Sequence, residues 1–261
     1  MSSRSTLGMQ QFLQVIMHNE VLSDQEVSNE CVRILGERSH VRCITEINNS
    51  LSSINMAIQS GKDELTGEIF WAFVPTIKDE KMRYQSKYTQ AQLDLLRAIF
   101  LEILDSENGF ISSIDALNIQ STLEPRLSHA EAETTIGEMV SSKWLSSKEG
   151  NIYIGVRSTI ELMPFFRASH HDEFNACPIC DRSLFHGHKC ENCQAVHHLY
   201  CLGIAKKRTG MLECFKCKKT LNATDLPCID LNSSRGSQAE QDGTPSPPIK
   251  IKGKGKKRKE H

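Results

Sequence analysis

Residues 177–217 read CPICDRSLFHGHKCENCQAVHHLYCLGIAKKRTGMLECFKC and decide the fold of the C-terminal part of the chain. They contain four successive pairs of zinc-ligand residue types, each with two residues between its members. The pairs are Cys177 and Cys180, Cys190 and Cys193, His198 and Cys201, and Cys214 and Cys217. Such a pair suits a tight turn that directs both side chains at one metal ion. Four pairs supply two complete tetrahedra, so the sequence predicts two structural Zn²⁺ sites with no open position for water.

The alternative to zinc is a disulfide framework, because this segment holds seven of the ten cysteines. Disulfides persist in oxidising compartments, but the N-terminus lacks the charged and apolar segments of a signal peptide. No apolar run reaches the roughly 18 residues that span a membrane. We therefore expect an intracellular protein that binds zinc and no membrane. Zinc should supply the stability of this short segment, so we expect chelation to unfold it and leave the rest folded.

The histidine ligand has two candidates, because His197 and His198 are adjacent. His198 has the two-residue spacing to Cys201 that the other pairs show and is preferred, with His197 left open. His186 and His188 fall in the loop between the first and second pairs. Exposed polar side chains are expected there.

The N-terminal part of the chain repeats one order of elements. Apolar residues at helical spacing predict three helices, over residues 7–22, 23–37 and 44–60, the last ended by Gly61. A β-branched and aromatic strand follows over residues 68–74. The order returns with helices over residues 90–104, 112–120 and 128–142 and a hairpin over residues 143–156. Three helices closed by a hairpin are typical of a winged helix.

The predicted fold class is therefore mostly α with small β wings. Two tandem winged-helix domains, residues 1–84 and 85–169, precede a small two-zinc module over residues 170–220. A final helix near residues 158–167 leads into that module. Residues 221–261, rich in Ser, Gln, Asp, Gly and Pro at first, are predicted to be a disordered linker with a basic tail.

The charge is distributed unevenly along the chain. Residues 250–261 hold seven of the 31 Lys and Arg residues and one of the 32 acidic residues. The tail is a candidate nuclear import signal or DNA contact. The predicted third helix of the first winged helix, residues 44–60, contains Glu46 and no Lys or Arg. The predicted third helix of the second, residues 128–142, contains Glu131, Glu133 and Glu138 and again no Lys or Arg. DNA-reading helices need cations, so we expect protein docking and little DNA binding by the body.

Two classes of zinc module share this ligand order, the variant RING and the PHD finger. Both interleave their pairs in a cross-brace, so that the first and third pairs bind one ion and the second and fourth bind the other. PHD fingers usually carry an aromatic residue where this chain has Leu212, whereas Ile179 matches the apolar position with which RING domains contact a conjugating enzyme. Phe215 and Lys218 depart from the RING pattern and indicate weak activity without a partner.

Together, the tandem winged helices, the variant RING and the basic tail resemble the non-structural maintenance of chromosomes element 1 family over roughly residues 1–220. The resemblance implies a RING-type ubiquitin ligase subunit of a five–six type SMC complex in the nucleus, acting on chromosomes in DNA repair by homologous recombination. It also implies winged helices that pair with a MAGE-type subunit, and contacts with kleisin and SMC subunits. The alternative is a PHD-like histone-tail reader or a scaffold without catalytic activity.

Overall fold

The computed structural model describes residues 3–76, 88–169, 175–223 and 226–227. The first unit begins with helices α1 (Ser3–Asn19), α2 (Asp24–Leu35) and α3 (His40–Leu51). Its strands β1 (Val21–Ser23), β2 (Met56–Lys62) and β3 (Ile69–Pro75) form an antiparallel sheet in the order β1-β3-β2. The three helices and this sheet confirm the first predicted winged helix.

The end of the third helix differs from the prediction. Helix α3 stops at Leu51, a short 3-10 turn covers Ser52–Ile54, and Asn55 has a left-handed φ of 55°. The i, i+4 spacing of Ile54 and Ile58 resembles a helix face, but Ile54 is 59% exposed and Ile58 is buried in β2. The predicted helix over residues 44–60, ended by Gly61, is therefore wrong in its second half, which forms one strand of the wing.

The earlier helix boundary also changes the charge of the third helix. Helix α3 includes Arg42, which the predicted segment omitted, and its exposed guanidinium pairs with Glu46 at 3.3 Å. The corresponding helix of the second unit, α7 (His129–Ser141), carries Glu131, Glu133 and Glu138 and no Lys or Arg. One arginine paired with a carboxylate leaves α3 without a cationic surface.

The second unit repeats the first one. It consists of α5 (Gln90–Asp105), β4 (Phe110–Ser112), α6 (Ser113–Asn118), the 3-10 turn Ile119–Thr122, α7, β5 (Leu145–Lys148) and β6 (Asn151–Ile154). Its sheet order is β4-β6-β5, and Ser128 begins α7 with a capping box. The second predicted winged helix is thereby confirmed, and it packs its own core around Leu95, Ile99 and Met139.

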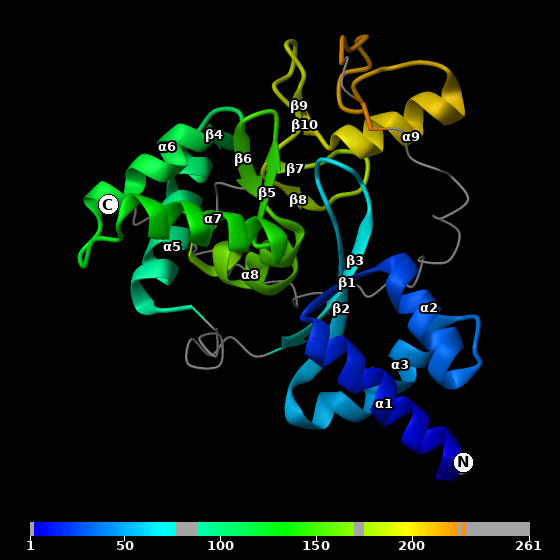
Figure 1. Ribbon diagram of the computed structural model, residues 1–261. Coiled ribbons are helices and arrows are strands. Elements are labelled where there is room, and N and C mark those ends of the chain that lie inside the picture. The colour runs from blue at the N-terminus through cyan, green and yellow to red at the C-terminus, as the bar shows by residue number, and fades with distance from the viewer. Residues whose placement is uncertain (1–2, 77–87, 170–174, 224–225, 228–261) are drawn as a thin grey trace, which may run out of the picture.

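Helix α8 (Val156–Ser169) joins the two winged helices. Trp71 of β3 faces the core of the first unit, while Phe70, Ala72 and Val74 on the other face pack against Val156 and Ile160. Both faces of β3 are covered, which explains its nearly continuous apolar sequence. Figure 1 shows α8 between the second unit and the hairpin of β2 and β3.

The start of α8 also carries a buried ionic contact. The Arg157 side chain donates to Glu161 at 2.7 Å and to Glu20 of the first unit at 2.5 Å. Its guanidinium carbon lies 4.3 Å from the centroid of the Trp144 ring. Arg157 therefore contacts both winged helices at once.

The zinc module lies at the end of the β2–β3 hairpin (Figure 1). It comprises β7 (Asn175–Ala176), β8 (Ser183–Leu184), β9 (His188–Lys189), β10 (Val196–His197) and α9 (Leu199–Thr209). Order continues past residue 220, because Leu221 is buried and Leu226 packs beside it, contrary to the predicted start of disorder at residue 221. The basic tail, within residues 228–261, lies outside the described residues. Among the helices that are described, none is long and apolar enough to cross a membrane.

We predict that Arg157→Met destabilises the full chain by on the order of 1–3 kcal/mol, because it leaves Glu161, 20% exposed, and Glu20, 40% exposed, without the cation between them. The matched control is Arg97→Met, which removes an exposed pair with Asp94 on α5 and should change stability by about 0.5 kcal/mol or less. Urea unfolding followed by circular dichroism measures both. Equal effects of the two substitutions would contradict this role of Arg157.

Candidate metal centre

Three C-x2-C turns in the module share one backbone conformation. In each turn, the residue after the second cysteine has a left-handed φ: 55° at Asp181, 59° at Gln194 and 62° at Lys218. The N–H of that residue donates to the carbonyl of the first cysteine at 2.8 Å in all three turns. The repeated turn leaves both thiols on the same side of the chain, as a shared metal ligand pair requires.

The structure brings the eight side chains into two groups. Cys177, Cys180, His198 and Cys201 form the first cluster, and Cys190, Cys193, Cys214 and Cys217 form the second. Within each cluster, the four candidate ligand atoms lie within 4.8 Å of one another. This interleaved grouping is the cross-brace arrangement.

The distances within the clusters fit zinc and exclude disulfides. Cys190 and Cys217 have their sulfurs 3.7 Å apart, and Cys193 and Cys214 have theirs 3.5 Å apart. A tetrahedral ion with Zn–S bonds of about 2.3 Å places two sulfurs roughly 3.8 Å apart, whereas a disulfide needs about 2.05 Å. Both clusters could therefore hold a metal ion, and their thiolate-rich donor sets match the preference of zinc.

The electrostatics of the thiols also favour a cation. Hydrogen bonds from Cys180 and Cys201 lower the pKa of Cys177, and a backbone hydrogen bond from Lys219 lowers the pKa of Cys217 to about 6. The thiolate is the form that binds a metal.

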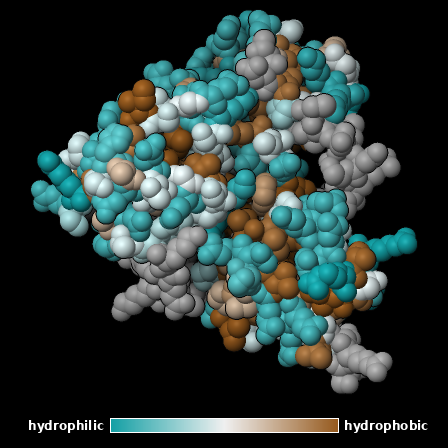
Figure 2. All heavy atoms as spheres, viewed as in Figure 1, coloured by the Kyte–Doolittle hydropathy of each residue, from teal (hydrophilic) through white to brown (hydrophobic). Residues whose placement is uncertain are grey.

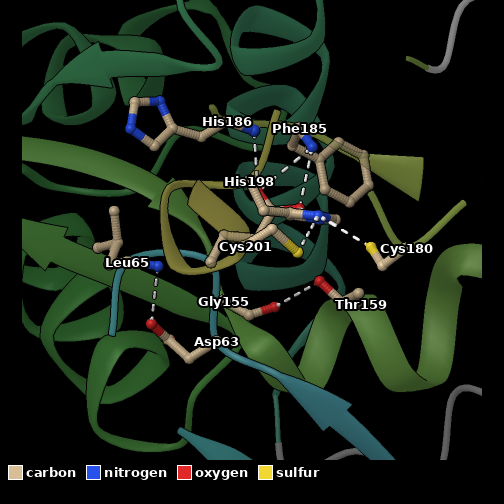
Figure 3. Close-up of polar contacts among 10 residues, drawn as sticks. Asp63, Leu65, Gly155, Thr159, Cys180, Phe185, His186, His198 and Cys201 are labelled. Atoms are coloured by element: carbon tan, nitrogen blue, oxygen red, sulfur yellow. Dashed lines mark hydrogen bonds and ion pairs between the residues drawn. The ribbon is translucent and has the colours of Figure 1, made fainter. Parts of the chain in front are cut away.

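The two adjacent histidines lie at different clusters. Nδ1 of His198 is 3.4 Å from Sγ of Cys180 and 3.9 Å from Sγ of Cys201 (Figure 3). His197 lies instead beside the second cluster, where its Nε2 is 3.7 Å from Sγ of Cys214 and accepts the N–H of Phe215 at 3.3 Å. The geometry therefore groups His198 with Cys177, Cys180 and Cys201, and places His197 next to a cluster that already has four cysteines.

At the tip of the β2–β3 hairpin of the first winged helix, Glu64 meets the module, a contact that the sequence did not predict, and Asp63 lies beside it. The Glu64 carboxylate, only 7% exposed, accepts the N–H of Phe185 at 3.0 Å and that of His186 at 2.8 Å. Asp63 accepts the N–H of Leu65 at 3.0 Å, which shapes the turn (Figure 3). Burial raises the pKa of Glu64 to about 7, against the opposing influence of His198 and the two backbone N–H groups.

His186 joins the module to the second winged helix. Its Nδ1 lies 2.8 Å from the carbonyl oxygen of Asn108, so this nitrogen carries the proton and donates. The ring packs edge-on against Tyr153, at 4.9 Å between centroids, and against Phe110 at 5.9 Å. Gly109 beside it has φ +72°, and an added Cβ would meet the Phe185 carbonyl oxygen at 2.0 Å. The expectation of exposed polar residues in this loop is thus wrong for His186.

Ile179 and Leu212 pack among the ligands. Ile179 is partly buried and contacts the apolar cores around both clusters. Leu212 packs against the second core. Phe215, 40% exposed, has the Lys218 ammonium 5.2 Å from its ring centroid. The Lys218 side chain therefore packs on a residue of the turn that presents Cys214 and Cys217.

A protein-family comparison identifies the chain. The family model described as "Nse1 non-SMC component of SMC5-6 complex" matches residues 1–162, which span both winged helices. The chain belongs to the Nse1 family. The "Non-structural maintenance of chromosomes element 1 homolog" of Mus musculus is 33% identical over 199 residues, which are 73% of this chain and 75% of that protein. The homolog of Rattus norvegicus is 32% identical over 214 residues, 79% of this chain and 80% of that protein.

More distant Nse1 proteins and a solved structure agree with this membership. "Non-structural maintenance of chromosomes element 1" of Schizosaccharomyces pombe is 26% identical over 199 residues, 73% of this chain and 83% of that protein. The solved structure "Nse1-Nse3-Nse4 complex" contains a chain that superposes with a TM-score of 0.71 at 25% identity, covering 83% of this chain and 97% of that one. The Nse1 family assignment therefore rests on sequence and on fold.

The junction at His186 predicts a pH dependence of stability. Burial lowers the pKa of His186 below its usual 6.5, so the folded protein binds fewer protons at this site than the unfolded chain. The neutral His186 ring contributes fully to stability at pH values above the pKa of this residue in the unfolded chain. This contribution is lost as the pH falls through the lower pKa of the folded state. We predict that thermal stability falls more steeply from about pH 7.5 to about pH 5.5 in the wild type than in His186→Phe.

The control for this measurement is His18→Asn, because His18 is exposed on α1. Its pH profile should follow that of the wild type. Parallel profiles for the wild type and His186→Phe would show that His186 titrates equally in the folded and unfolded chains, which would contradict its placement in the junction.

Proposed function

We propose that the chain is the RING-type ubiquitin ligase subunit of an SMC5-6 type complex, in which it holds a ubiquitin-charged conjugating enzyme near its substrate. The observation that carries this proposal is the interleaved grouping of eight ligands in a chain of the Nse1 family. We assign one Zn²⁺ to Cys177, Cys180, His198 and Cys201, and a second Zn²⁺ to Cys190, Cys193, Cys214 and Cys217. Each set fills all four positions of its ion, so both metals would serve structure and supply no activated water.

The mechanism follows from what the zinc module presents to solvent. Ile179 stands between the first two ligands, and the exposed Met211 and Phe215 lie in the segment around the last pair. We propose Ile179 as the contact for the conjugating enzyme. No residue of the chain would react covalently, because the gain comes from holding the enzyme's thioester close to a substrate lysine.

The proposed partners of the winged helices are a MAGE-type subunit and a kleisin. The solved complex contains Nse1 together with Nse3 and Nse4, which supports assigning the corresponding partners to this chain. Exposed large apolar side chains on the first unit are available for such docking: Leu7, Met17, Val32 and Ile54. Hydrophobic residues gather over this unit in the lower part of Figure 2. Large apolar side chains left exposed on a domain are candidate contacts for a protein partner.

The same proposal includes action in DNA repair by homologous recombination, in the nucleus and on chromosomes, together with contacts to SMC subunits. Family membership supports this role, since the family is described as a component of the SMC5-6 complex. The body is not proposed to bind DNA, because α7 is acidic and the one arginine of α3 is paired. The basic tail stays the candidate for DNA contact or nuclear import.

The second candidate function, a PHD-like histone reader, is disfavoured by the aromatic residues of the module. A methyl-lysine cage needs exposed aromatic faces. Tyr200 is 4% exposed and stacks on His198, and Phe185 is partly buried where the module meets Glu64. Phe215 has an exposed ring but lies under Lys218. These three rings do not form a free cage.

We predict that Ile179→Ala slows ubiquitin discharge by the assembled complex about five- to tenfold at subsaturating conjugating enzyme, since truncating an anchor at an interface costs more than ~1 kcal/mol. The control is Ile114→Ala, an exposed isoleucine on α6 of the second winged helix. Zinc content of each variant is measured in parallel, so that loss of the module is not mistaken for loss of a contact.

Two outcomes would overturn the proposal. Wild-type discharge by an Ile179→Ala complex that retains two zinc ions would remove Ile179 from the contact. Saturable binding of histone H3 peptides without any discharge, with the MAGE-type partner present, would favour the histone reader over the ligase.

A further inference from the structure

The hairpin of the first winged helix reaches the side of His198 that faces away from the first cluster. Nδ1 of the ring points at the cysteines, while Nε2 lies 3.9 Å from Oε1 of Glu64. Both side chains are nearly excluded from solvent, with exposed fractions of 2% for His198 and 6% for Glu64. The His198 imidazole thus directs Nδ1 toward the candidate metal position and Nε2 toward the Glu64 carboxylate.

Glu64 is held in this place by the module. Its Oε1 accepts the N–H of Phe185 at 3.0 Å, and its Oε2 accepts the N–H of His186 at 2.8 Å. These two bonds fix the carboxylate against the loop between the first and second ligand pairs. A buried carboxylate is costly unless it is neutralised or fully bonded, and the side-chain nitrogen that faces this carboxylate is Nε2 of His198.

A tyrosine of α9 supports the His198 ring from its face, and a second hairpin residue contacts that tyrosine. The Tyr200 ring stacks on His198 with centroids 4.6 Å apart and planes inclined by 22°. The Lys62 ammonium of β2 lies 5.4 Å from the centroid of Tyr200. Glu64 therefore faces His198 directly, whereas Lys62 contacts the tyrosine that stacks on it.

The second cluster has a different environment in the described residues. Its four candidate ligands are all cysteines, and its neighbouring histidine, His197, comes from the module itself. Among the described residues, the β2–β3 hairpin reaches the surroundings of the first cluster, through Glu64 beside His198 and Lys62 beside Tyr200. The two clusters are thus unequal in their dependence on the winged helices.

We propose that Glu64 is the outer-shell carboxylate of the first zinc site, which orients His198 through Nε2 and makes the first winged helix part of that site. Metal-ligating histidines commonly donate their second N–H to such a group, which fixes the tautomer and the ring orientation. The inference rests on the proposed zinc sites and is independent of the ligase activity. It assigns Glu64 a positioning role, because the carboxylate acts on the metal through His198.

The experiment compares zinc release from the full chain, using excess chromogenic chelator, for the wild type and Glu64→Gln. Glutamine keeps the volume and one carbonyl acceptor for the loop N–H groups but lacks the charge that faces Nε2. We expect one of the two ions to leave about 10–100-fold faster and the other at the wild-type rate. Glu68→Gln, an exposed glutamate on the same hairpin, should leave both rates unchanged.

A second pair of variants separates positioning from packing. In His198→Cys, the ligand has no second nitrogen for Glu64, so adding Glu64→Gln should leave the release rate of that ion unchanged. A role through the loop alone would keep the full effect of Glu64→Gln in the His198→Cys background, and that result would overturn the proposal. Substitution with cobalt identifies the faster site, because cysteine–histidine and all-cysteine sites differ in their visible absorption.

Two further results would also be decisive. Wild-type release of both ions from Glu64→Gln, in a chain that binds two zinc ions, would refute the outer-shell role and leave the zinc sites standing. A wild-type chain that binds fewer than two zinc ions would overturn the zinc assignment itself, and this inference with it.

Discussion

The tip of the β2–β3 hairpin, Asp63 and Glu64, holds the three parts of the molecule together. Asp63 accepts the hydroxyl of Ser146, in the second winged helix, at 3.2 Å, and Glu64 accepts two N–H groups of the zinc module. Buried carboxylates need complete sets of partners, and these partners come from three separate units. The relative placement of the winged helices and the module is therefore specified by polar contacts of stringent geometry, in addition to the apolar packing around α8.

The proposed zinc ions and this junction would stabilise the module in different ways. Three identical turns present six of the eight ligands, and this local geometry needs nothing from the winged helices. The remaining pair, His198 and Cys201, begins α9, and His198 faces Glu64. A ligase that acts by holding an enzyme in place benefits from a module whose orientation is fixed. In this account, the winged helices supply that orientation.

Local chemistry was predictable from the sequence, and contacts between distant segments were not. The ligand pairs and the core faces depend on neighbouring residues, so their spacing predicted the zinc-ligand pairs and the winged helices, while the cross-brace grouping came from the known modules that share this ligand order. The end of α3 was misplaced because Ile54 and Ile58 have helical spacing across the left-handed Asn55. Glu64 and His186 gave no signal, since the bond between them joins residues 122 positions apart. An acidic hairpin tip looks the same in a sequence whether it is solvated or buried.

Amide hydrogen exchange of the full chain before and after zinc removal tests the central claim that the module and the first wing form one unit. Zinc removal should deprotect the module and also the wing-tip amides of Leu65, Thr66 and Gly67, which are bonded to Asp63. The amides of α5 and α7 should keep their protection, because their core does not include the clusters. Loss of protection confined to residues 175–223, with the wing tip unchanged, would contradict the account.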